Sequence, residues 1–160
     1  WKFIVAGSGS GDYYNSVVNF IKEKKLENSV IFPGHMNDSQ LSYIYRRAGA
    51  LAFPSIIEGF GYPVLEAMDC GVPVITSNCS SLKEIGGDAA ILVDPYDTND
   101  ISFAMRKISD DQVLRKKMSE KGIAQAKKFS WNIAGRKMLD IIDSHFQNMA
   151  KNPPPFRHPL

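Results

Sequence analysis

Two glutamates in a glycine-rich segment are the residues of this sequence best suited to chemistry. Glu58 and Glu66 lie eight positions apart, with Gly59 and Gly61 between them. Because glycine has no Cβ, a ligand can come close to the backbone at these two positions. A carboxylate can accept two hydrogen bonds from neighbouring hydroxyl groups. The segment therefore indicates a site for a ligand that is rich in hydroxyls.

A helix is predicted to begin at Pro63, directly after the glycines. Proline is favoured at the first helical position, since its missing N–H would have no partner there. The backbone N–H groups of Val64, Leu65 and Glu66 would then be free and, together with the helix dipole, would attract an anion such as phosphate. The residue types fit a second interpretation equally well, in which Glu66 only interacts with the helix dipole and Glu58 is solvated.

A second glycine run, GSGSG, follows the first apolar stretch of the chain. The dinucleotide-binding fingerprint would need a glycine where this chain has Asp12, and an acidic residue closing the next strand. That strand ends at residues 32–34 without a carboxylate. These differences argue against NAD or FAD and favour a tight turn with Asp12 as the helix N-cap. Gly7 and Gly9 are still expected to line a ligand cleft, because loops at the carboxyl ends of parallel strands do so.

Short apolar runs alternate with amphipathic stretches along the chain, which predicts a parallel sheet of at least five strands between two layers of helices. The fold class is therefore three-layer α/β/α, in one domain over residues 1–150, with a proline-rich tail over 151–160. We expect strands near 2–6, 29–34, 49–53, 72–78 and 89–95, and helices near 12–25, 37–49, 63–70, 81–87, 98–108, 110–128 and 131–150.

Composition excludes several classes of function. The 160 residues carry a net charge of +2 and 44% hydrophobic residues, which suits a packed domain and gives no reason to expect a nucleic-acid partner. No apolar run is long enough to span a membrane. Cys70 and Cys79 are expected to be buried free thiols, and three histidines form no zinc pattern, so we expect no metal and a cytoplasmic protein. The chain opens inside a strand without a methionine, as a piece of a longer protein would.

The segment E-G-F-G-x-P-x-L-E-A-M-x-x-G-x-P-V-I, which begins at Glu58, resembles the signature of the group 1 (family 4) retaining glycosyltransferases. Glu58 and Glu66 match the two glutamates of that signature. FIVAGSGSG, VIFPGHMNDSQLSYIYRRAGALAFPS, SSLKEIGGDAAILVDPYD and FSWNIAG resemble further segments of the family's carboxyl-terminal domain, in the same order. The resemblance implies the GT-B fold, of which this chain would be the Rossmann-like, donor-binding half.

The resemblance also implies roles for individual residues. Glu58, the catalytic candidate, would contact hydroxyls of the transferred sugar, Leu65 would offer its N–H to phosphate, and Glu66 would hold the ribose. The residues expected against the sugar and the diphosphate are Gly59, Phe60 and Gly61. The loop of Gly34, His35 and Met36 would contact the base, although a surface-loop histidine without that role is the commoner case.

By this resemblance the chain binds a nucleoside-diphosphate sugar, GDP-mannose or a UDP-sugar, and belongs to an enzyme that transfers the hexose to a glycan or glycolipid in polysaccharide or glycoconjugate synthesis. No cofactor is expected. The acceptor would bind an amino-terminal domain outside this sequence. Members of the family also carry an Arg and a Lys after an earlier strand of the donor-binding domain, where they neutralise the diphosphate, and that segment too is expected outside this sequence. The fragment alone should therefore be inactive. The full-length protein would be cytoplasmic, with peripheral association at the inner face of the membrane. The alternative is a nucleotide-sugar-binding module without transferase activity.

Overall fold

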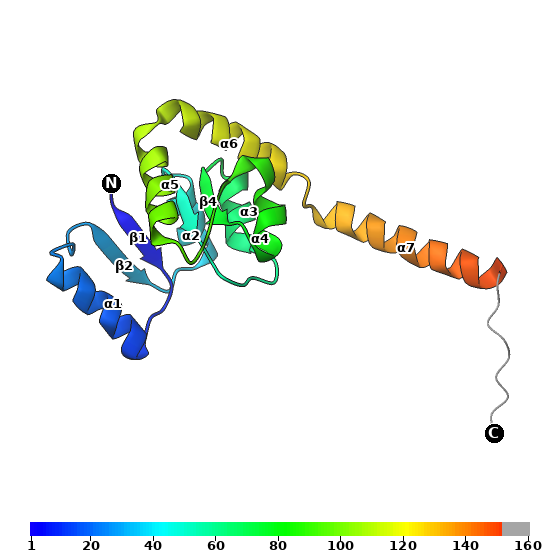
Figure 1. The fold of residues 1–160 in the computed structure, drawn as a ribbon. Helices are drawn as coiled ribbons and strands as arrows, with labels where there is room; N and C mark the ends of the chain where they lie inside the picture. Colours follow the sequence, from blue (N-terminus) through cyan, green and yellow to red (C-terminus); the bar gives the residue numbers. More distant parts are fainter. Residues whose placement is uncertain (152–160) are drawn as a thin grey trace, which may run out of the picture.

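The computed structural model describes residues 1–151, with side chains through Met149. Five strands and seven α-helices alternate along the chain, as expected, with one short 3-10 helix (Figure 1). The strands are β1 (Phe3–Ala6), β2 (Val30–Gly34), β3 (Leu51–Phe53), β4 (Val74–Ser77) and β5 (Ile91–Val93). The helices are α1 (Gly11–Glu23), α2 (Asp38–Tyr45), α3 (Tyr62–Asp69), α4 (Ser80–Gly86), η1 (Gly87–Ala89), α5 (Thr98–Asp110), α6 (Gln112–Ala126) and α7 (Trp131–Lys151).

The strands form two parallel sheets, β1–β2 and β3–β4–β5. In the first sheet Ile4 pairs with Ile31, and in the second Ala52 pairs with Ile75. Parallel strands with flanking helices confirm the predicted Rossmann-like α/β class. The prediction of one continuous sheet is wrong, because a cavity lies between β1 and β3 and these two strands share no ladder of hydrogen bonds.

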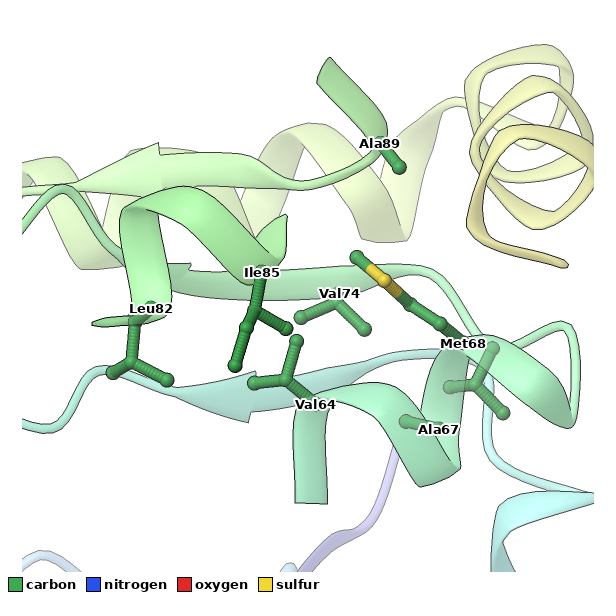
Figure 2. Close-up of a cluster of buried hydrophobic side chains, with 8 residues drawn as sticks. Val64, Ala67, Met68, Val74, Leu82, Ile85 and Ala89 are labelled. Carbon is green, nitrogen blue, oxygen red and sulfur yellow. The ribbon is translucent and has the colours of Figure 1, made fainter. Parts of the chain in front are cut away.

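The core lies on both faces of the sheet β3–β4–β5. Val74 and Ile75 are neighbours in β4, so their side chains point to opposite faces. Val74 belongs to a buried cluster with Val64, Met68 and Ile85 from α3 and α4 (Figure 2). On the other side, the cluster around Ile75 is built from β5, α5 and α6, and its buried members are Val93, Ala104, Ile108 and Met118. Helices therefore cover both faces of this sheet, which is the predicted three-layer arrangement.

The N-cap residues of two helices, α2 and α1, can be compared with those predicted from the sequence. The α2 helix was expected to begin near residue 37, with Asn37 or Asp38 as N-cap, and the N-cap is Asn37. Its side chain accepts a hydrogen bond from the Gln40 N–H while the Gln40 side chain accepts one from the Asn37 N–H. This reciprocal pair is a capping box. The prediction of Asp12 as the N-cap of α1 is wrong, because the extended N-cap residue is Ser10 and Asp12 lies in the first helical turn.

The last helix, α7, projects away from the rest of the molecule (Figure 1). The side chains of residues 131–149 are exposed, including those of Trp131, Met138 and Ile141 along its apolar stripe. Within the described residues, no helix is both long and apolar enough to cross a membrane. The proline-rich tail predicted for 151–160 lies outside the described residues, apart from Lys151.

Candidate donor-binding site

The loop after β3 turns sharply into α3 at Gly61. Its φ of 103° is in the left-handed region, and a Cβ built there would lie 2.5 Å from Cδ2 of Leu82. Glycine is required for both reasons. The helix begins at Tyr62, one residue before the predicted start at Pro63.

This helix start corrects the prediction of three free N–H groups. The Val64 N–H donates to the Gly61 carbonyl at 3.0 Å, so it is already paired. Glu66 lies in the second turn of α3, where a helical N–H pairs with the carbonyl four residues earlier. For Leu65, the contact with phosphate stays a prediction.

Of the two carboxylates, Glu58 lies in the loop and Glu66 on the helix, as the sequence analysis predicted. Glu58 is half-buried and Glu66 is exposed, so both side chains are accessible. Within the described residues neither belongs to an ion pair, and the pair found there joins Lys24 to Glu23. Both carboxylates therefore remain free to accept hydrogen bonds from a ligand.

A row of side chains holds the backbone of the loop that carries Glu58. This donor row consists of Thr76, Ser77, Cys79 and Ser81, at the end of β4 and the start of α4. Their hydroxyl or thiol groups donate to the carbonyls of Phe53 (3.0 Å), Ser55 (2.5 Å), Ile56 (3.4 Å) and Glu58 (2.9 Å), respectively. The loop from β3 to Glu58 is thus fastened along its length to the neighbouring strand and helix.

The sequence analysis missed the donor row. A signal was present, since TSNCSS is a dense run of hydroxyl and thiol residues directly after an apolar strand. Such residues are also common as helix caps and turn formers, which hides any longer-range role. Their acceptors lie 22 or 23 residues earlier in the chain and become neighbours only through the pairing of β3 with β4.

Phe60 lies between the two carboxylates in sequence, but its ring packs toward the end of α6. The ring centroid is 4.8 Å from that of Tyr62 and 6.3 Å from that of Phe129, which packs against the core cluster of α3 and α4. The expected contact of this residue with a sugar or diphosphate would therefore involve the exposed part of the ring or its backbone. At Gly59 a Cβ would meet no atom within 4 Å, so this position is open to a ligand.

The structure joins the loops after β1 and β2. The Gly7 N–H donates to the Gly34 carbonyl at 3.0 Å, and both residues have left-handed φ angles, 132° and 78°. Beyond this junction, His35 is exposed and Met36 is half-buried. Gly9 lies against Tyr14, whose ring a Cβ at that position would overlap. The predicted base-contacting loop and glycine run are thus neighbours at the carboxyl ends of adjacent strands.

Tyr45 is a further residue near Glu66 that the sequence analysis did not single out. It ends α2, and its side chain packs against the core cluster of α3 and α4. Burial, and then the Glu66 carboxylate as a nearby charge and hydrogen-bond acceptor, raise the pKa of Tyr45 to about 12. The hydroxyl therefore stays protonated at neutral pH and can donate to Glu66.

The cysteines and the potential metal ligands complete the description of residues 1–149. Cys70 and Cys79 are free thiols, as predicted, but both are half-buried, whereas they were expected to be buried. No group of three or more His, Cys, Asp or Glu side chains suited to a metal occurs within residues 1–149.

Comparison with known proteins decides the family. The model of the glycosyl transferases group 1 family matches residues 1–125, which include both glutamates and the donor row. The chain belongs to the group 1 glycosyltransferases. An O-antigen chain mannosyltransferase B of Escherichia coli is 44% identical over 105 residues, or 66% of this chain and 28% of the relative. A D-inositol 3-phosphate glycosyltransferase of Corynebacterium jeikeium is 31% identical over 145 residues, covering 88% of this chain and 35% of the relative. This group 1 chain thus spans about a third or less of these two relatives.

Solved structures agree with the fold. HepE of Anabaena, in complex with UDP and glucose, superposes with a TM-score of 0.80 at 21% identity over 89% of this chain and 40% of its own. The carboxyl-terminal domain of a group 1 glycosyl transferase, LpcC of Francisella tularensis, gives a TM-score of 0.73 at 26% identity, covering 80% and 69% of the two chains. The Rossmann-like half of the GT-B fold is therefore the architecture of this group 1 chain.

Proposed function

We propose that this chain is the donor-binding half of a retaining hexosyltransferase that uses a nucleoside-diphosphate sugar. The observation that carries the proposal is the unit from β3 to α3, in which Glu58 and Glu66 are both accessible and, among the residues that the structure describes, outside any ion pair. Mannose is the favoured sugar, since several relatives at 34–44% identity are named mannosyltransferases. GDP-mannose is then the donor, and a UDP-sugar is the second candidate, because structural neighbours hold UDP.

The chemistry needs stabilisation of a leaving nucleoside diphosphate while the sugar gains positive charge. We assign Glu58 to hydroxyls of the transferred sugar, where its charge also favours the oxocarbenium-like transition state. Glu66 binds the ribose, and the junction of Gly7 with Gly34 supports the loop that meets the base. No metal is needed in this scheme. The acceptor, a glycan or glycolipid of cell-surface polysaccharide, binds the other half of a full-length cytoplasmic enzyme that associates with the inner face of the membrane.

The test uses the full-length protein with Glu58→Gln and Glu66→Gln, and Glu120→Gln, at an exposed position of α6, as the matched control. Loss of one charged hydrogen bond costs about 1.5–3 kcal/mol, or roughly 10- to 150-fold. Calorimetry should show this loss in nucleoside diphosphate affinity for Glu66→Gln. Glu58→Gln should keep that affinity and lose turnover by a similar factor, because it acts on the reacting sugar.

The same full-length protein tests which donor is used and whether the anomeric configuration is retained. GDP should bind more tightly than UDP, and the product from GDP-mannose should keep the α configuration of the donor by NMR. Inversion of the anomeric centre would refute the retaining mechanism. Donor binding without any transfer in the presence of the membrane glycolipid fraction would favour the alternative, a nucleotide-sugar-binding module.

A further inference from the structure

One helix carries an excess of positive charge. Residues 112–128, which form α6 and the turn that ends it, include six basic residues and one acidic residue, a net charge of +5. The whole chain carries +2, so the rest of the sequence is acidic on balance. The six basic residues are Arg115, Lys116, Lys117, Lys121, Lys127 and Lys128, and the acidic one is Glu120. Such an asymmetry of charge indicates an anionic partner for this part of the molecule.

The five lysines form an exposed surface, which we call the lysine face. All five are exposed, whereas the buried residues of α6 are Met118, Gly122 and Gln125. Gly122 lies against Met68 of α3, and the Gln125 side chain donates a hydrogen bond to the Ile85 carbonyl of α4 at 3.0 Å. One side of α6 is thus fixed to the domain, and the lysines lie on the other side, at the outer surface of the molecule (Figure 1).

The stability of α6 does not explain the lysine face. Lys127 and Lys128 lie at the carboxyl end of the helix, where the helix dipole favours cations, but the other three lie outside this last turn. Lys117 and Lys121 are four positions apart, and like charges at this spacing destabilise a helix. Within residues 1–149 the ion pair found joins Lys24 to Glu23, so no lysine of the face is paired with a carboxylate.

We propose that the lysine face binds the surface of a membrane that contains anionic phospholipids. A cluster of about four to eight basic residues along a helix is typical of such binding, in which each ammonium group attracts headgroup phosphates. Val113, which is 80% exposed and one turn before Lys116 and Lys117, adds an apolar group that enters the headgroup layer. Nucleic acid is a less suitable polyanion, because the face offers neither arginine nor an aromatic side chain for bases. No surface had been assigned to the membrane association of the full-length enzyme, and α6 supplies one.

The lysine face ends beside the candidate donor-binding site. Phe129 directly follows Lys128, and its ring centroid is 6.3 Å from that of Phe60, which lies between the two glutamates in sequence. The fixed side of α6 packs against α3, the helix that carries Glu66. With a membrane on the lysine face, α6 alone therefore separates α3 from the lipid surface. A glycolipid acceptor could then reach the site while its lipid stays in the bilayer, and this step rests on the proposed function.

Vesicle cosedimentation of the full-length protein tests the proposal. Vesicles of phosphatidylethanolamine with about 30% phosphatidylglycerol should bind the protein more tightly than vesicles of phosphatidylcholine. The binding should weaken steeply between about 0.1 M and 0.5 M salt, because ions screen exposed charges. Equal binding to both kinds of vesicle, or tighter binding to RNA or DNA than to the anionic vesicles, would overturn the proposal.

Two variants of α6 change the charge of the lysine face in opposite directions. One lysine near an anionic surface strengthens membrane partition about fivefold, so Lys116→Gln, Lys117→Gln and Lys121→Gln together should weaken it on the order of 100-fold. Glu120→Lys should strengthen it about fivefold or more, a gain that no folding defect can produce. Unchanged partition in these two variants would overturn the proposal.

A control of equal charge distinguishes the lysine face from the net charge of the protein. Lys22→Gln, Lys24→Gln and Lys25→Gln remove three exposed lysines at the end of α1, and this triple variant should bind the vesicles as the unmodified protein does. Equal losses in the two triple variants would show that net charge alone acts, and would overturn the proposal.

Nucleoside diphosphate binding separates this proposal from the proposed function. Calorimetry should give the same GDP affinity for the unmodified protein and for the triple variant of α6, because none of the candidate donor-binding residues is changed. If the unmodified protein bound no nucleoside diphosphate, the proposed function would be refuted, whereas the vesicle measurements would still decide whether the lysine face binds a membrane.

Discussion

The hydrogen bond from Ser81 to the Glu58 carbonyl gives the most direct test of the donor row. Ser81→Ala removes the hydroxyl that lies 2.9 Å from that carbonyl and changes no other part of the site. The loop then loses its last attachment before Glu58, while the attachments from Thr76, Ser77 and Cys79 remain. Glu58 should become less well positioned, although its own side chain is intact.

The size of the effect follows from one neutral hydrogen bond. Such a bond contributes about 0.5–1.5 kcal/mol, which corresponds to roughly 2- to 13-fold in a rate or binding constant. We expect that loss in kcat/KM for sugar transfer by the full-length enzyme. The affinity for the free nucleoside diphosphate should stay unchanged, because Glu66 and α3 hold the nucleotide in the proposed scheme.

Two variants make this result specific. Ser81→Thr keeps a hydroxyl and should restore most of the activity. Ser144→Ala removes a hydrogen bond of the same kind, to the Asp140 carbonyl on α7, and should leave transfer unchanged. If Ser81→Ala weakened nucleoside diphosphate binding as much as it lowered turnover, or left turnover unchanged, the positioning argument would be refuted.

Two further predictions concern stability. Gly61→Ala should lower the free energy of unfolding in urea by about 2 kcal/mol or more, because alanine is strained at this φ and its Cβ would overlap Leu82. Gly59→Ala, with open space around it, should cost far less, and equal costs would contradict the steric argument. Tyr45 should make stability fall between pH 10 and pH 12, since its folded pKa is raised from 10.0 to about 12 and the unfolded chain loses its proton first. The loss of unfolding free energy is at most about 2.7 kcal/mol, and solvent screening of this half-buried side chain makes it smaller. The Tyr45→Phe variant should lack this fall in stability between pH 10 and pH 12. If the variant showed the same pH dependence as the unmodified protein, Tyr45 would not be responsible.

The sequence analysis placed each helix and strand of the described residues to within a few positions. It succeeded where the signal is local, as at the start of the helix expected from residue 37, where the capping box of Asn37 with Gln40 needs only residues three apart. It was less accurate where a residue distant in the sequence determines the local structure. The α3 helix begins at Tyr62 because the left-handed Gly61 fits against Leu82, twenty-one residues later in the chain.

Some residues of the candidate site could be found from the sequence and others could not. The glutamates and glycines were candidates by their types, their spacing and the resemblance to the family, and the structure leaves both carboxylates accessible. The donor row could not be identified from the sequence, because a serine or threonine after a strand gives the same sequence pattern whether it caps a helix or binds a distant loop. The separation of β1 from β3 could not be predicted either, since periodicity identifies strands but not which strand edges meet.

The distribution of buried side chains has a consequence for the order of folding. Of the buried hydrophobic residues, Ile21 is the sole one from residues 1–63, whereas α3, β4, α4 and β5 supply most of the rest. These four elements are consecutive in the chain, so their contacts close short loops and cost little entropy. We expect residues 51–93 to form a first cooperative unit, against which α5 and α6 then pack. The unit of β1, α1 and β2 would join last and open first, which makes the loops of Gly7 and Gly34 the most easily reshaped part of the molecule.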